Sequence, residues 1–166
     1  MVRFILKDKL FSLGGDLGIE DSQGRQVYFV DGKLISIGRR LEIMDSSGQV
    51  VATIQQRILA LRRTYDIQLP NNIKVSISKA LFSPLIDRLK IDVPGPGDLD
   101  VHGDLLHHEY SIDLSGQEVA RVSKKWISLV DAYGIEIEES VDPLLILVCA
   151  VVIDQILDEE REEHHH

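Results

Sequence analysis

The sequence predicts a mainly β protein: a closed barrel of twelve antiparallel strands, built from six hairpin repeats, that encloses a central hydrophobic C-terminal α-helix. Two observations lead to this fold class. A unit with β character recurs six times, and its copies begin 22 to 24 residues apart. One segment near the C-terminus is apolar on every side but falls short of the roughly 20 residues needed to cross a bilayer. We therefore expect the repeats to surround this segment.

The repeats share a basic first residue, an apolar stretch and a second motif that ends in Ile. Four copies agree position for position, and their first segments read KLFSL, KLISI, RILAL and KWISL at residues 9–13, 33–37, 57–61 and 125–129. The copies that begin at Lys79 and His102 match less completely, and His102 replaces the basic residue. This recurrence indicates one structural unit used six times.

The local pattern favours a hairpin for each unit. Runs rich in β-branched residues precede the copies, for example at residues 27–30 and 73–77. Turn residues separate the units. Three turns read Asp-x-x-Gly, at residues 21–24, 45–48 and 113–116, and two combine Pro with Asn or Gly, at residues 70–72 and 94–97. Six hairpins give twelve strands, which are many for one open sheet, and closure removes the exposed edges. A barrel of this size has a lumen that strand side chains alone do not fill.

The segment at residues 142–160 is predicted to be the helix that fills this lumen. Asp142 can accept hydrogen bonds from the first free amides, and Pro143 suits the first helical position. Residues 144–153 are apolar throughout, so the helix needs an enclosure. We expect protein to provide it, and the chain is predicted not to be transmembrane.

Length and composition indicate one domain, at residues 1–163, followed by the histidines 164–166 of a purification tag. The formal charge of −9 argues against sequence-independent binding to nucleic acid, which needs Lys and Arg to neutralise phosphates. Cys149 is the only cysteine and lies inside the apolar helix, so it is expected to be core filler. Because the N-terminus has no features of a secretory signal, a cytoplasmic location is expected.

Several segments carry a resemblance to a known family. They read DSSG, GD, YSI, VARVSKKW and VID at residues 45–48, 103–104, 110–112, 119–126 and 152–154. These segments resemble the LURP-one-related family of plants and bacteria, and the predicted fold resembles the tubby C-terminal domain and the phospholipid scramblases. The resemblance implies the barrel with its central helix. The family's own function is largely undefined. Tubby domains bind phosphoinositides through basic residues, although those positions have no individual match here.

Residues with metal-ligand chemistry are densest near His102, which is followed by Asp104, His107, His108 and Glu109. Because alternation along a strand would send His107 and His108 to opposite faces, a solvated turn is favoured over a metal site. No nucleophile elbow, phosphate loop, dinucleotide fingerprint or zinc-protease signature is present. The sequence therefore predicts no enzyme, no metal and no cofactor.

Trp126, which follows two lysines, is compatible with two roles. It could sit at a membrane interface, but it occupies the repeat position that other copies fill with Leu or Ile. Packing is therefore the favoured role.

The basic first position of the repeats is the main candidate site. Equivalent positions in successive hairpins lie at one end of a barrel, so they predict a basic rim. The rim consists of Lys9, Lys33, Arg57, Lys79 and Lys125, to which Arg39, Arg40, Arg62 and Arg63 of the following connections add. Clustered cations attract anionic lipid headgroups, so the predicted function is a non-enzymatic binding domain, peripheral to a membrane, for anionic lipid or phosphoinositide.

Other functions stay open at this stage. The acidic end of the predicted helix runs towards the same rim, so the basic residues could instead serve only to neutralise it. A protein-interaction adaptor or structural domain without a lipid ligand is the alternative, and a metal-dependent enzyme around His102 and His107 is a further one.

Overall fold

The computed structural model describes residues 1–9, 16–35, 38–57, 63–79, 88–92, 98–127 and 132–164. Within them, twelve strands precede one α-helix, α1 (Pro143–His164). The strands are β1 (Val2–Lys9), β2 (Asp16–Asp21), β3 (Gln26–Ile35), β4 (Gly38–Asp45), β5 (Val50–Arg57), β6 (Thr64–Gln68), β7 (Lys74–Lys79), β8 (Arg88–Asp92), β9 (Leu99–Asp104), β10 (Glu109–Leu114), β11 (Gln117–Ser123) and β12 (Ala132–Ile137). Two 3-10 helices, η1 (Pro70–Asn72) and η2 (Leu105–His107), lie between strands. The prediction of a mainly β fold with a C-terminal helix is confirmed.

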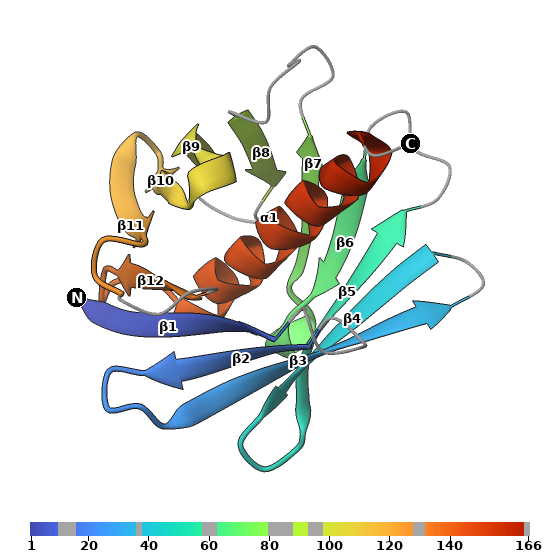
Figure 1. Cartoon of the computed structure of the whole chain (residues 1–166), viewed down its shortest axis with the longest axis horizontal. Coiled ribbons are helices and arrows are strands. Elements are labelled where there is room, and N and C mark those ends of the chain that lie inside the picture. The colour runs from blue at the N-terminus through green and yellow to red at the C-terminus, as the bar shows by residue number, and fades with distance from the viewer. Residues whose placement is uncertain are drawn as a thin grey trace.

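Each strand pairs antiparallel with the strands before and after it in the chain. β1 also pairs with β12, from Val2 opposite Ile137 to Lys7 opposite Ala132, so the strand order forms a closed barrel. The six pairs from β1 with β2 to β11 with β12 are the six sequence repeats. Figure 1 shows the strands curving around α1, which crosses the interior from the β12 side towards the tips of β5, β6 and β7.

The repeats are visible as a recurring irregularity in the strands. The register shifts immediately after Ile19, Ile43 and Ile112, which are the final Ile residues of three repeats. Each shift comes just before a strand runs into an Asp-x-x-Gly turn. An extra residue at such a bulge increases the local twist and helps the sheet to curve.

The turns confirm the chemistry predicted for them. The Asp21 carboxylate accepts hydrogen bonds from the backbone N–H groups of Gln23 and Arg25, and Asp45 does the same in the equivalent turn. Gly48 has a φ of 86°, which favours glycine. The turn after β10 differs because Ser115 and Gly116 both have positive φ, as a tight two-residue hairpin requires. The predicted turn at residues 94–97 lies outside the described residues.

The helix begins as predicted and ends later than predicted. Asp142 Oδ1 accepts a hydrogen bond from the Leu144 N–H at 3.1 Å, and Pro143 is the first helical residue. The expected end near residue 160 is wrong, because α1 continues to His164, in the histidines assigned to the tag. The acidic run after Leu157 contains no Gly or Pro, and Glu and Arg are good helix formers, so nothing there stops the helix.

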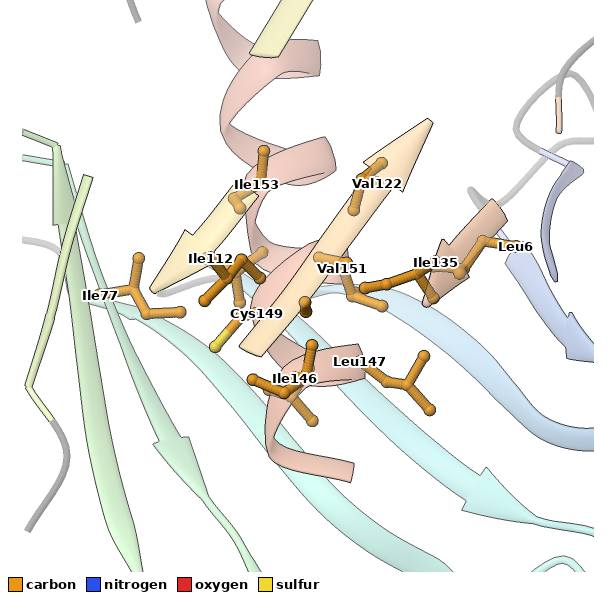
Figure 2. Packing of buried hydrophobic residues seen from close by; sticks show 14 of the residues in the cluster. Leu6, Ile77, Ile112, Val122, Ile135, Ile146, Leu147, Cys149, Val151 and Ile153 are labelled. Atoms are coloured by element: carbon orange, nitrogen blue, oxygen red, sulfur yellow. The ribbon is translucent and has the colours of Figure 1, made fainter. Parts of the chain in front are cut away.

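The core lies between α1 and the inner face of the strands. Ile146, Leu147 and Cys149 are fully buried, and the contact surface continues to Leu157, which is 1% exposed. Figure 2 shows Ile77, Ile112, Val122 and other strand residues directed at this helix. The enclosure of the apolar helix by protein is therefore confirmed. In the described part of the chain, no helix combines the length and apolar character needed to cross a membrane.

Candidate functional site

The basic rim can be located from the strand register. Lys9, Arg57 and Lys79 are the last residues of β1, β5 and β7, and Lys33 in β3 pairs with Arg40 in β4. Lys125 follows the end of β11. All five backbone positions therefore lie where the first strand of a hairpin turns into the second. The side chains of Lys9, Lys33, Lys79 and Arg39 and the whole of Arg62 lie outside the described residues.

Two arginines of the rim have acidic partners. Arg57 makes two contacts with Asp66, from Nη2 to Oδ1 at 2.6 Å and from Nε to Oδ2 at 3.1 Å. This hydrogen bonding is the main cause that lowers the pKa of Asp66, with a smaller contribution from Ser76, while partial burial opposes it. Arg63 Nε lies 3.0 Å from Glu159 Oε2 of α1. The expectation that α1 brings negative charge to the rim thus agrees with this contact, whereas the Lys125 side chain is exposed.

Glu159 is the centre of a larger set of contacts at the rim. Its Oε2 accepts a hydrogen bond from Gln56 Nε2 at 3.2 Å, and its Oε1 accepts one from Gln155 Nε2 at 3.0 Å. The Tyr65 hydroxyl also donates to Oε1. The side chains of Arg63 and Glu159 are only 16% and 14% exposed, so the ion pair is largely withdrawn from water. We call Gln56, Arg63, Tyr65 and Glu159 the mouth cluster.

A second polar cluster lies deeper along α1. The Tyr133 hydroxyl donates a hydrogen bond to Asp154 Oδ2, and His108 Nδ1 lies 3.6 Å from Asp154 Oδ1. The His108 ring stacks on the Tyr133 ring with centroids 4.4 Å apart and an interplanar angle of 14°. We call these three residues the inner cluster. The inner cluster supplies polar partners for Asp154, which is the first acidic residue of α1 and follows eleven helical residues without an acidic side chain.

Tyr110 is the neighbour of the inner cluster on β10. It is 2% exposed, and its hydroxyl makes no hydrogen bond among the described residues. Burial, together with the nearby Asp154 and Cys149, raises the pKa of Tyr110 well above its usual value. The hydroxyl is therefore neutral at physiological pH.

The tyrosines of both clusters were missed by the sequence analysis, although a signal for them exists. Tyr65, Tyr110 and Tyr133 occupy the repeat position that is Leu17 and Leu41 in the first two copies. This position faces the interior, where all three tyrosines are 1% to 2% exposed. At Tyr65 and Tyr133, the replacement of Leu by Tyr marks a polar partner on α1, since a buried Tyr hydroxyl usually has one, whereas the Tyr110 hydroxyl makes no hydrogen bond among the described residues.

The predicted cluster of metal-capable residues does not converge. His102 Nε2 contacts Asp113 at 2.9 Å, and His107 Nδ1 contacts Asp104 at 2.7 Å. Glu109 instead accepts hydrogen bonds from the Ser123 hydroxyl and the Lys124 N–H. No group of three metal-capable residues is found in the described ranges.

The turn favoured for this segment is confirmed, with His107 exposed to solvent, although the strand alternation assumed for His107 and His108 is not observed. His107 ends η2, and His108 has the left-handed φ of 54°. This turn, rather than a strand, exposes His107 and directs His108 to Asp154.

Cys149 and Trp126 have the structural roles that were favoured for them. Cys149 is fully buried, and burial raises the pKa of its thiol to about 12, which leaves it unreactive at neutral pH. Trp126 packs over Gly134 on the outer face of β12, where a Cβ added to that glycine would lie 3.0 Å from Trp126 Cε3. The Arg3 guanidinium carbon lies 4.9 Å from the centroid of the same ring.

Comparisons with known proteins now decide the family. The LURP-one-related family matches this chain over residues 2–154. The chain belongs to the LURP-one-related family. The match includes the whole barrel and the inner cluster, and it ends at Asp154, before the mouth cluster's Glu159.

Two individual proteins are similar to this chain. The chain is 27% identical over 163 residues to the Bacillus subtilis "Uncharacterized protein YxjI", covering 98% of each protein. Its structure is similar to the X-ray structure of a protein from Arabidopsis thaliana, with a TM-score of 0.70 and 16% sequence identity. This likeness covers 93% of the present chain and 90% of the plant chain, and it shows the fold alone.

Proposed function

We propose that this LURP-one-related protein is a non-enzymatic binding domain for anionic lipid headgroups, which it holds at the basic rim. The closed barrel around α1 is its scaffold, and the acidic end of α1 is an intramolecular cover. The observation that carries the proposal is the recurrence of Lys or Arg where the first strand of five hairpins ends. Cations gathered in this way attract phosphate groups on a membrane surface. The domain would act in the cytoplasm, peripheral to the membrane.

The acidic residues at the C-terminal end of α1 support the proposal that the basic rim is covered in the free protein. Residues 158–163 contain five acidic residues and one arginine, a net −4 of the chain's −9. Glu159 already contacts Arg63, so this part of the charge opposes the rim directly. A proposed kinship with tubby domains, which bind phosphoinositides through basic residues, points to the same ligand class.

Vesicle co-sedimentation tests the proposal, using phosphatidylcholine vesicles with and without phosphoinositide at low and moderate salt. Truncation after Leu157 should strengthen binding to the anionic vesicles, and the gain should shrink as salt rises, because screening weakens exposed charges. The combined change Lys33→Glu, Lys79→Glu and Lys125→Glu should remove the gain.

The strand β7 offers a matched control. Lys74 is its first residue and Lys79 its last, so Lys74→Glu and Lys79→Glu make the same charge change at opposite ends of the barrel. Lys79→Glu alone should weaken vesicle binding by the truncated protein, and Lys74→Glu should leave it nearly unchanged. If neither the full-length nor the truncated protein binds, and both remain folded, the lipid function is wrong.

The second candidate is a protein-interaction adaptor. It is favoured by exposed apolar side chains at the end opposite the rim, where Val50 begins β5 and Ile73 precedes β7, with exposures of 44% and 40%. Absence of vesicle binding, combined with protein capture that is lost in Val50→Ser and Ile73→Ser variants, would favour the adaptor.

A further inference from the structure

The contacts of Glu159 resemble those that a bound anion would make. A guanidinium, a phenol hydroxyl and a primary amide from the barrel reach its carboxylate oxygens. Hydrogen bonds between charged groups are stronger than neutral ones, and Arg is well suited to carboxylate and phosphate. The site therefore has both the charge and the donor geometry of an anion receptor.

The barrel builds these donors without help from α1. Gln56 and Tyr65 are directly opposite each other in the β5–β6 register, and Arg63 is two residues before Tyr65. Tyr65 is 1% exposed, so its ring is fixed by the core around it. Strand pairing consequently holds Gln56 and Tyr65, and Arg63 lies one residue before β6, while the carboxylate is supplied by a different element.

Glu159 is an occupant that can be displaced. The apolar part of α1 ends at Leu157, so movement of the residues after it leaves the core covered. Glu159 also lies in the C-terminal part of the helix, beside Asp158 and Glu160. The net charge of −4 over the acidic segment at residues 158–163 disfavours a further carboxylate there.

We propose that Gln56, Arg63 and Tyr65 form a binding site for a phosphate monoester and that Glu159 occupies this site in the free protein. The inference rests on the proposed function, since it names one receptor within the rim and the group that closes it. A phosphate dianion carries more charge and more acceptor oxygens than the carboxylate. It takes the place of Glu159 while the end of α1 moves away from the mouth of the barrel.

The variant Glu159→Gln tests this directly, because it keeps the side-chain size and removes the competing charge. Calorimetric titration should show inorganic phosphate and a soluble inositol phosphate binding about tenfold more tightly than to the unchanged protein, because the competing occupant is weakened. Adding Arg63→Gln should abolish this gain. Vesicles with phosphoinositide form a third arm, which separates a membrane ligand from a soluble phosphate.

Two further forms of the protein control for charge and folding. Glu139 contacts the N-terminal amino group at 3.4 Å and follows β12 at the opposite end of the barrel. Glu139→Gln makes the same change in net charge and should leave phosphate affinity unaltered. Truncation after Asp158 removes Glu159 by another route and should reproduce the gain, provided that it melts cooperatively.

The outcomes separate this inference from the proposed function. If both folded forms lacking the Glu159 carboxylate bind every phosphate probe no more tightly than the unchanged protein, the inference is overturned. It is also overturned if the gain survives Arg63→Gln. Vesicle binding that depends on Lys79 but not on Glu159 would leave the lipid function standing alone. Binding of soluble phosphate without any vesicle binding would support the receptor and contradict the lipid function.

Discussion

Asp154 and Glu159 are two carboxylates of one helix, five residues apart, that the same barrel accommodates differently. Asp154 lies deep and has the Tyr133 hydroxyl and His108 as partners. Glu159 lies at the rim and has a guanidinium in addition to a tyrosine and two amides. The two side chains are almost equally buried, at 12% and 14% exposed, but their partners differ: a hydroxyl and an imidazole for Asp154, and a permanent charge for Glu159. This difference suggests that the inner cluster holds the helix and that the mouth cluster can open.

The largest loss of stability is expected from a substitution that places a carboxylate without partners in the core. Ala150 is one helical turn before Asp154 and is fully buried among apolar side chains. Ala150→Asp should prevent folding, because an unpaired charge in the core costs several kcal/mol. Loss of soluble expression or of the cooperative melting transition is the measurement. Ala150→Ser is the control, since its hydroxyl can bond to the helix backbone, and it should still fold. Normal melting of the Asp variant would contradict the enclosure of α1.

The second-largest loss of stability is expected from a substitution in β9, where Gly103 pairs with Tyr110 of β10. Gly103 has a φ of 124°, and a Cβ built on it would lie 2.8 Å from both the Glu109 carbonyl oxygen and Tyr110 Cα. Gly103→Ala should lower the free energy of unfolding by about 3 kcal/mol, since backbone atoms must move and the φ is strained. Chemical denaturation measures this loss. Gly48→Ala is a useful comparison, because its φ is also positive but no atom lies within 4 Å of the added Cβ, so its loss should be smaller.

Removing one tyrosine hydroxyl at a time compares the two clusters directly. Tyr133→Phe should lower the free energy of unfolding by about 1–3 kcal/mol, because it removes a hydroxyl that donates to the largely buried carboxylate of Asp154. Tyr65→Phe should cost less, about 1 kcal/mol, because Arg63 and two amides still donate to Glu159. Both values come from denaturation of otherwise identical proteins. An equal or larger loss for Tyr65→Phe would contradict the distinction between a holding cluster and an opening one.

The smallest effect is expected at an ion pair outside the barrel. The Asp66 side chain is 46% exposed, so solvent screening limits what Asp66→Asn can cost to about 0.5 kcal/mol. The hydrogen bond from Arg57 lowers the pKa of the Asp66 carboxyl below its ordinary value. A lowered folded-state pKa means that the contribution is present above about pH 4 and is lost as pH falls through the folded pKa. Melting curves of both proteins should therefore converge in acid, and a difference that grows in acid would contradict this assignment.

Much of the architecture was set by short-range patterns that the sequence displays. The repeat spacing, the Asp-x-x-Gly turns and the start of α1 at Pro143 each depend on residues close together in the chain. Such features follow from backbone conformation and side-chain alternation, which neighbours determine. The apolar segment of α1 likewise predicts that the helix is buried, without identifying the residues that surround it. The helix ends later than predicted because no Gly or Pro follows Leu157 to stop it.

The functional clusters were decided only by the tertiary structure. Tyr65 and Glu159 are 94 residues apart, and Tyr133 and Asp154 are 21 apart. Alternation tells which strand residues face inwards, but the depth and rotation of α1 inside the barrel determine which of them meet its carboxylates. The sequence by itself determined that a helix fills the barrel. The placement of that helix results from packing of the whole core, and therefore only the folded chain decided that Arg63 pairs with Glu159 and His108 with Asp154.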